Sequence, residues 1–360
     1  MLGHHLFAFA ERLPIGFQYN SIAIGNVDLI VLLGNFGKIC VALFMFLGGY
    51  GMMEQYKLRQ EGVLSRRILS VYKGYWRVFV IFVPIGFLLF SEQPDYFAEV
   101  SFCHVFSSFD LQGLLSTFVG LSDNYNHEWW FLKVYLCTGF LGYLYIVNVK
   151  KKGGYTEYFF VILIAIFARE VLPAIAQSQV FGRLKDNWFY MNLLALHEYS
   201  PTFFAGIVFA KYDGFSLLRK EIRNVKCTWM RNILCIGGII LIILLRTHLL
   251  GAGFDIIMVP LFMALVVELL DNMKYIRRVV GYLGKHSTNM WLVHSFYCYY
   301  YYEVVKLVYF TSNPWLVWAW LTVLSLGSSI VIDYLYKIPQ IVRKQIEKKS
   351  LSSQKVGVIQ

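Results

Sequence analysis

The sequence predicts an all-α fold, a polytopic bundle of about ten transmembrane helices. Apolar residues make up 58% of the 360 residues and charged residues only 15%, against roughly 25% charged in a typical soluble domain. Apolar runs recur along the whole chain, and a helix needs about 20 mostly apolar residues to cross a bilayer. No polar stretch is long enough to build a soluble domain.

The apolar runs define the spans in chain order. We expect helices near residues 28–53, 77–91, 128–147, 155–175, 196–212, 232–250, 254–272, 287–310 and 315–336. Residues 1–10 form a further apolar run that is too short to cross roughly 30 Å of hydrocarbon. We therefore expect the first span to be incomplete, with its natural start upstream of Met1 or lost.

Charge in the connecting segments predicts the orientation. Lys and Arg gather in every second connecting segment, at 57–77, 150–152, 211–231, 274–285 and 337–355. The other segments hold little beyond Arg12, Arg183 and Lys185. By the positive-inside rule the first set is cytoplasmic. The net charge of +11 is then explained by topology, and nucleic acid is not an expected partner.

We divide the chain into an integral-membrane domain at 1–336 and a basic cytoplasmic tail at 337–360. The protein is expected in the cell membrane as a multi-pass protein in contact with lipids, with the bacterial plasma membrane as the favoured location. The six cysteines show no pair at metal-ligand spacing, so neither a disulfide framework nor a metal site is expected.

One histidine lies inside an apolar run near the end of the chain, in the stretch Gly284 to His294. Positions seven apart on a helix share a face, so Ser287, Trp291 and His294 should line one stripe. An ionisable side chain at membrane depth is costly and usually marks a functional site. A histidine bonded to a neighbouring helix is the structural alternative.

His4 and His5 close the first apolar run at its predicted outer end. Neighbouring helical residues point about 100° apart, so we expect only one of them to face the interior. An interior histidine could act as a general base on a sugar hydroxyl, because its pKa lies near working pH. A pair of interfacial histidines is the alternative.

The segment from Ser65 to Arg77 is a basic, aromatic approach to the span at 77–91. Guanidinium groups bind phosphates well, and an adenine can stack on Tyr or Trp. Arg66, Arg67 and Arg77 could therefore hold a nucleotide-like donor. Topology signalling and contact with anionic lipids explain the same charges.

His127, Glu128 and Trp130 stand at the predicted outer start of another span, where paired Trp is first of all typical of an aromatic belt. The two titratable groups add a possible sugar-binding or cavity role. Lys133 lies deeper, and we expect it to pair with Glu128 or with a carboxylate on another helix.

Further charges lie within or beside apolar runs: Lys38, Arg169, Glu170, Arg246, Asp255, Glu268, Glu303 and Lys306. Such residues normally face the interior and pair with one another, which predicts a polar cavity with Arg169 among its candidate residues. Glu303 and Lys306 are three apart and can pair. Tyr297 and the run Tyr299 to Tyr302 are interpreted as an aromatic belt or as a carbohydrate-facing surface.

Four stretches together resemble the membrane-bound acyltransferase-3 family, whose members O-acylate polysaccharides and glycolipids. Phe36 to Gly51, with its Phe-rich segment before Gly-Gly-Tyr, is similar to the family's second helix. The segment from Arg66 to Trp76 resembles the basic loop that follows this helix in the family. Trp130 to Leu132 resembles the start of a later helix. Gly284 to His294 is similar to the family's Gly-Lys-x-Ser and Leu-x-His stretch.

This resemblance implies acetyl-CoA as the acyl donor, reaching the bundle from the cytoplasm, with no bound cofactor. The donor would meet Arg66, Arg67, Arg77 and Ser287, although Ser287 also suits a helix N-cap. His4 or His5 matches the family's essential first-helix histidine, as a base in direct transfer or as a carrier of the acyl group. The basic residue that precedes this histidine in the family would fall before Met1, and Ser70 stands where the family has a further Arg.

The leading functional prediction is thus an integral-membrane O-acetyltransferase acting on a surface polysaccharide or lipid-linked glycan. A glycolipid flippase or exporter, or a glycan polymerase, is the alternative, because each also needs a charged, aromatic-lined cavity. The Arg-Arg-aromatic segment, together with histidines at both ends of the bundle, favours the transferase. A transporter often shows internal repeats, and none is visible in the sequence.

Overall fold

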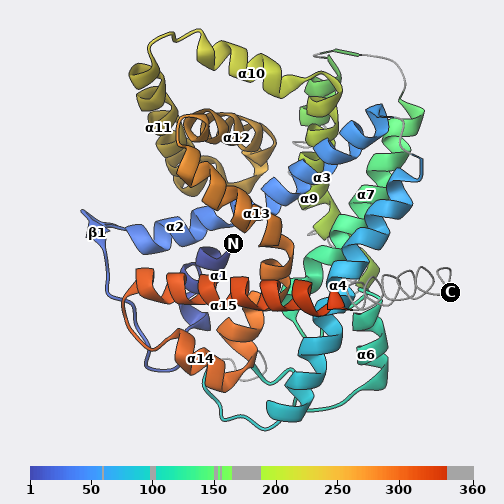
Figure 1. The fold of residues 1–360 in the computed structure, drawn as a ribbon, viewed down its shortest axis with the longest axis vertical. Coiled ribbons are helices and arrows are strands. Elements are labelled where there is room, and N and C mark those ends of the chain that lie inside the picture. Colours follow the sequence, from blue (N-terminus) through green and yellow to red (C-terminus); the bar gives the residue numbers. More distant parts are fainter. Residues whose placement is uncertain (59–60, 98–102, 150–152, 155, 164–187, 339–360) are drawn as a thin grey trace, which may run out of the picture.

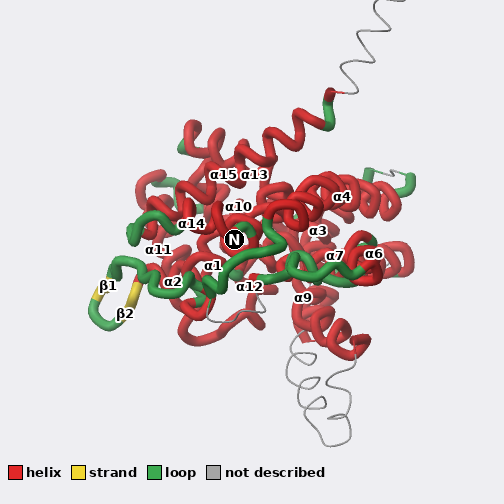
Figure 2. Tube along the Cα trace, turned by 90° about the horizontal axis from the view of Figure 1, so that it is seen from below, coloured by secondary structure: helices red, strands yellow, loops and turns green. Residues whose placement is uncertain are grey.

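The computed structural model describes residues 1–58, 61–97, 103–149, 153–154, 156–163 and 188–338. It is a bundle of helices with one short hairpin, β1 (Ala23–Ile24) paired with β2 (Val27–Asp28), which projects from the edge of the bundle (Figure 2). Six helical stretches of the described chain are long and apolar enough to cross a membrane. The predicted all-α polytopic fold is confirmed.

The long helices that contain or flank these stretches are α2 (Leu29–Gly37), α3 (Ile39–Lys57), α4 (Val63–Leu89), α7 (Trp130–Asn148), α9 (Trp188–Lys211), α11 (Thr228–Leu244), α12 (Asp255–Asp271), α13 (Lys274–Ser295) and α15 (Pro314–Leu335). Shorter elements are α1 (Leu2–Phe7), α6 (Leu111–Phe118), α10 (Gly214–Arg223), α14 (Tyr302–Val308), the 3₁₀ turns η1 (Ala10–Arg12), η2 (His127–Trp129) and η5 (Gly251–Phe254), and the π turns η4 (Leu245–Leu250) and η6 (Phe296–Tyr300). Figure 1 shows their arrangement.

Two predicted spans have the wrong boundaries. The helix predicted at 77–91 begins at Val63, so the basic segment before residue 77 is itself helical. The span predicted at 287–310 is wrong, because α13 runs from Lys274 to Ser295 and a π turn and a break at Tyr301 follow. Hydropathy reports the part of a helix that lies in lipid, whereas a helix can continue into water.

Several predicted features lie outside the described residues. They are most of the span at 155–175, of which 156–163 is described as helix, together with Arg169, Glu170, Arg183, Lys185, 150–152 and the tail from 339 onward.

The tightest helix pair is α3 with α9. A Cβ added at Gly49 would lie 1.9 Å from the Phe203 carbonyl oxygen, and one at Gly206 would lie 2.1 Å from that of Phe46. Small residues at such crossings let membrane helices approach to backbone contact. The two helices are therefore held as one unit.

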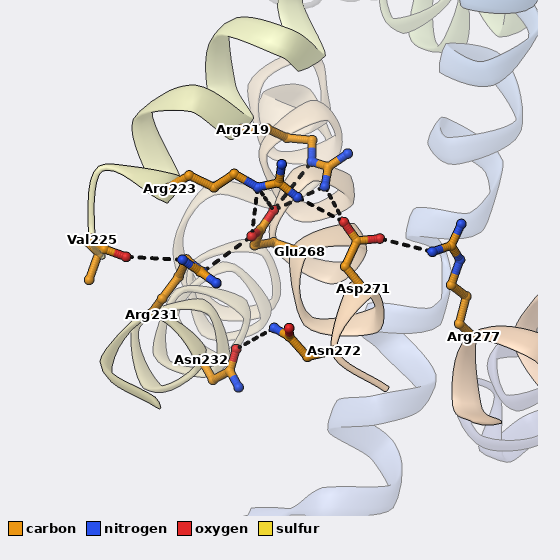
Figure 3. A network of polar contacts seen from close by, with 9 residues as sticks. All are labelled: Arg219, Arg223, Val225, Arg231, Asn232, Glu268, Asp271, Asn272 and Arg277. Carbon is orange, nitrogen blue, oxygen red and sulfur yellow. Dashed lines mark hydrogen bonds and ion pairs between the residues drawn. The ribbon is translucent and has the colours of Figure 1, made fainter. Parts of the chain in front are cut away.

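The cytoplasmic segments, as assigned by charge, meet in a network of ion pairs (Figure 3). Glu268 is 2% exposed and contacts Arg219, Arg223 and Arg231, while Asp271 contacts Arg219, Arg223 and Arg277. This network joins α10, the first turn of α11, the end of α12 and the start of α13. It satisfies a buried carboxylate that would otherwise be costly.

The segments assigned to the other side also meet one another. The Ile15 amide donates to the Tyr96 carbonyl oxygen at 2.9 Å, and the Asn20 amide donates to that of Ser312 at 2.8 Å. The loop after α1 thus contacts the loop after α4 and the loop before α15. This grouping agrees with the alternation of charge along the sequence.

Helix α1 lies inside the bundle against α2, α13 and α15 (Figure 1). A Cβ at Gly34 of α2 would lie 2.6 Å from the carbonyl carbon of Phe7, and one at Gly37 would lie 3.0 Å from Cβ of His4. The two glycines therefore let α1 rest on α2 at backbone distance, which places His4.

The tyrosine run does not form a belt. Tyr297, Tyr299, Tyr300 and Tyr301 are buried, and the hydroxyl of Tyr299 donates to the His5 carbonyl oxygen at 2.6 Å. Both the belt and the carbohydrate-facing surface are wrong for these four residues. Their hydroxyls are satisfied inside the bundle, as buried tyrosines require.

Candidate active site

A cavity of about 310 Å³ opens between α1, α3, η2, α7, α9 and α13, and we call it the reaction cavity. It is lined by His4, His5, Phe9, Arg12, Lys38, Cys40, Val41, Phe44, His127, Glu128, Trp130, Phe131, Tyr199 and Trp291, together with Met1. Its walls combine imidazole, carboxylate and cationic groups with aromatic rings.

The hydrogen bond of His4 fixes which nitrogen can accept a proton. His4 is 9% exposed, and its Nδ1 lies 2.9 Å from the carbonyl oxygen of Gly34. A carbonyl oxygen can only accept, so Nδ1 carries the proton in the neutral ring. Nε2 then holds the lone pair, and a lone pair on an oriented imidazole is what general-base catalysis needs.

His5 has a different set of partners. Its Nε2 lies 3.4 Å from Oε2 of Glu128, whose Oε1 is 3.4 Å from Nη1 of Arg12. Nδ1 of His5 is buried and has no hydrogen-bond partner among the described residues. A His5 ring that donates to Glu128 through Nε2 therefore keeps its lone pair on this buried Nδ1.

Both histidines line the same cavity, with ring centroids 5.2 Å apart. The prediction that only one would face the interior is therefore wrong. Side chains 100° apart can flank one cavity when α1 is short and surrounded by other helices on every side.

Glu128 is held by the turn that carries it. The Asn126 side chain accepts from the Glu128 amide at 3.1 Å. It also donates to Oγ of Ser295 at 2.7 Å and accepts from that hydroxyl at 3.0 Å. The His127 amide donates to the hydroxyl oxygen of Tyr300 at 3.1 Å. η2 is thereby tied to α13 and η6, which orients the carboxylate.

His294 lies beside His5, with ring centroids 4.8 Å apart. It is fully buried, and its Nδ1 donates to the Trp291 carbonyl oxygen at 2.7 Å. The expectation of histidines at opposite ends of the bundle is wrong for His294, which joins His4 and His5. Of the predicted stripe, Trp291 lines the cavity, whereas Ser287 does not.

The predicted donor-binding residues lie outside this cavity. Arg66 bonds the carbonyl oxygen of Glu61, and Arg67 lies against Gly51. The guanidinium of Arg77 stacks on Tyr336, 4.9 Å from the ring centroid. Along α4, Arg77 is roughly 15 Å beyond the two other arginines at 1.5 Å per residue, so one phosphate cannot meet all three.

Ser287 is not at a helix start. Its hydroxyl donates to the Gly284 carbonyl oxygen at 2.8 Å in the middle of α13. The N-cap interpretation is wrong because the helix begins at Lys274.

Other predicted charges have found partners. Lys133 pairs with Asp123 at 3.6 Å, in the loop before its own helix, so the partners predicted for it are wrong. Arg246 and Asp255 form a buried two-point pair at 2.7 and 2.9 Å, and Glu303 pairs with Lys306 at 2.6 Å, as expected from their positions.

Two charged residues of the cavity are not among the predicted site residues. Arg12 was noted only for topology and Lys38 only as a buried charge, yet both line the cavity, and Lys38 Nζ lies 3.7 Å from Oε1 of Glu198. Their position depends on the break between α2 and α3 and on the turn η1, which the sequence does not reveal. Within the described chain, no three His, Cys, Asp or Glu side chains are grouped to hold a metal ion.

A family model described as an acyltransferase domain matches residues 1–334 of the chain. The chain belongs to the acyltransferase 3 family. It is a polytopic membrane acyltransferase, which uses an acyl donor and an acceptor. Comparison with curated proteins and with solved structures found no match. The resemblance of the four sequence stretches is confirmed, and the roles of individual residues in this acyltransferase remain predictions.

Proposed function

We propose that this acyltransferase moves an acetyl group from acetyl-CoA to a hydroxyl of a surface polysaccharide or lipid-linked glycan, with His4 as general base. The bond from His4 Nδ1 to the Gly34 carbonyl oxygen, inside the reaction cavity, carries the proposal. It leaves Nε2 as the proton-accepting nitrogen of the His4 ring.

The proposed reaction is a direct transfer. Nε2 of His4 takes the proton of the acceptor hydroxyl as its oxygen attacks the thioester carbonyl carbon. The new C–O ester bond forms and the C–S bond breaks. The imidazolium then returns its proton to the departing thiolate, so that coenzyme A leaves as a thiol and His4 is neutral again.

The other charged groups surround this base. Glu128 and Arg12 hold each other across the cavity, and His5 lies against the same carboxylate. Lys38 adds a second cation to the cavity wall. Positive charge at the cavity wall stabilises the oxyanion that forms at the thioester carbonyl.

We infer the class of acceptor from the volume of the reaction cavity and from the residues that line it. Trp130, Tyr199 and Trp291 present rings to the cavity, and aromatic side chains offer apolar faces with polar edges to amphipathic ligands. A volume near 310 Å³ is at the small end for ligand pockets. We expect one sugar unit to reach in while the rest of the glycan stays outside.

The test is transfer of label. Purified protein in proteoliposomes is incubated with acetyl-labelled acetyl-CoA and candidate polysaccharides or lipid-linked sugars, with the double variant His4→Ala, His5→Ala as control. We expect labelled, base-labile ester on the glycan with the parent protein only. Equal labelling by the folded double variant would contradict the assigned base, and no labelling of any glycan would contradict the acceptor class.

A further inference from the structure

A second, smaller cavity is lined by residues of α3, α7 and α9, three of the helices that also border the reaction cavity. On α3, Phe44 lines the reaction cavity and Met52 the second cavity; on α7 the corresponding residues are Phe131 and Tyr135, and on α9 they are Tyr199 and Phe203. The members of each pair are four or eight positions apart, which places them on one face of a helix. The two cavities are therefore aligned along the bundle.

Tyr135 and Phe203 line the second cavity one helical turn from Phe131 and Tyr199 of the reaction cavity. Tyr135 and Phe203, which we call the plug, have ring centroids 6.1 Å apart at 77°. Both rings rest on Gly48, where an added Cβ would lie 2.8 Å from Cε2 of Tyr135 and 2.9 Å from Cε2 of Phe203. Gly48 provides the space into which both rings fit.

Phe203 cannot move independently. It is fully buried, and its carbonyl oxygen lies against Gly49 at the contact that locks α9 to α3. Its ring is also confined between α3 and α7, because an added Cβ would lie 2.9 Å from it at Gly48 and 2.5 Å from it at Gly142. The fixed half of the plug is therefore on α9.

Tyr135 is less constrained than Phe203. No described residue hydrogen-bonds its hydroxyl, whereas the hydroxyls of Tyr299 and Tyr301 are tied to backbone carbonyls. The ring is partly buried. The ring contacts Phe131, with centroids 5.8 Å apart, but no hydrogen bond has to break for it to turn.

The second cavity has a cation in its wall. It holds about 10 Å³, which is room for roughly one water molecule, so a donor arm does not fit with Tyr135 in place. Arg67 lines it, and Nη1 of this guanidinium is buried with no hydrogen-bond partner among the described residues. An unsatisfied guanidinium N–H favours an incoming carbonyl or anionic oxygen.

We infer that Tyr135 closes a passage through which the arm of the acyl thioester reaches the reaction cavity from the Arg67 side. This inference rests on the proposed function, because that function supplies the donor. When Tyr135 turns away, the two cavities become continuous and Arg67 meets the donor's amide or phosphate oxygens. When it returns, water and protons are kept from the thioester.

Cys40 is a native reporter of this passage, since its thiol lies at the wall of the reaction cavity. Sealed vesicles of each orientation are treated with a small cationic methanethiosulfonate reagent. The rate of Cys40 modification is read by peptide mass spectrometry for the parent, for Tyr135→Ala, and for Phe140→Ala as the control on the same helix. Phe140 is 50% exposed and lies away from both cavities.

From the Arg67 side, Tyr135→Ala should raise the Cys40 rate at least tenfold, and Phe140→Ala should match the parent. From the opposite side, all three should react equally, which also shows that the variants are folded. An unchanged rate from the Arg67 side in Tyr135→Ala would overturn the inference. The readout needs no acetyl transfer, so failure of the proposed function would be seen separately.

Discussion

Replacing Gly34 by alanine tests how α2 positions the proposed base. The added Cβ would lie 2.6 Å from the carbonyl carbon of Phe7 and 2.7 Å from the amide nitrogen of Ala8. Both are backbone atoms, so no side chain can rotate away. Helix α1 must retreat by about 0.8 Å or more to reach an ordinary van der Waals separation.

That displacement acts directly on His4. The bond from Nδ1 to the Gly34 carbonyl oxygen, 2.9 Å long, would stretch to roughly 3.7 Å, beyond hydrogen-bond range. The imidazole would lose both its place and its preferred tautomer. Misplacing a catalytic group by about 1 Å can cost on the order of a hundredfold, so we expect kcat/KM of Gly34→Ala to fall by about that factor.

The assay is transfer of labelled acetyl to the glycan, with thermal unfolding measured in parallel. Overpacking should lower the free energy of unfolding by only ~1–3 kcal/mol, so folded protein should remain. Gly237→Ala is the matched control, because a Cβ there meets nothing within 4 Å. Activity of Gly34→Ala within threefold of the control would refute the idea that the α1–α2 contact places His4.

Three further predictions concern the charged groups. Glu128→Gln should lower kcat/KM by roughly tenfold to a hundredfold with little loss of Tm, because hydrogen bonds to charged groups contribute ~1.5–3 kcal/mol; unchanged kinetics would remove the carboxylate from the mechanism. Arg246→Met should lower the free energy of unfolding by about 3–5 kcal/mol, because the buried carboxylate of Asp255 loses its two-point bond to the guanidinium. Adding Asp255→Leu should recover much of this loss in denaturant unfolding, and no recovery would contradict the pairing. Glu268→Gln should lower Tm and make Tm rise with added salt, since three guanidinium groups then face one another and salt screens their repulsion; a Tm insensitive to salt would count against this account.

Much of the fold could be predicted because lipid imposes a simple rule on composition. The helix α15 begins and ends within a residue of the predicted span 315–336, and α12 agrees as closely with 254–272. Both consist mostly of apolar sequence. Where a helix leaves the hydrocarbon, as α4 and α13 do at their basic first halves, hydropathy no longer marks its start.

The candidate site was partly predictable for the same reason. His4, His5, Glu128 and Trp130 stood out as titratable or amphipathic groups beside apolar runs, and all four line the reaction cavity. The depth of a residue in the membrane does not tell to which side of its helix the side chain points. This is why Tyr297 to Tyr301 were assigned to the surface although they are buried.

The other residues of the site are brought to the cavity by tertiary contacts. Arg12 reaches the cavity from a 3₁₀ turn after α1, and Lys38 reaches it from the break between α2 and α3. Neither feature has a signature in hydropathy or helical spacing. The contact of Tyr135 with Phe203 likewise depends on how closely α7 and α9 approach each other beside Gly48 of α3.

The most direct test of the account compares His4→Gln with His5→Gln in single-turnover acetyl transfer at saturating acetyl-CoA. General-base catalysis is worth roughly 10²–10⁴-fold. We predict a loss of that size for His4→Gln with donor binding retained, and a clearly smaller loss for His5→Gln. Transfer by His4→Gln at a rate near that of the parent, or a larger loss in His5→Gln, would contradict the assignment of the base.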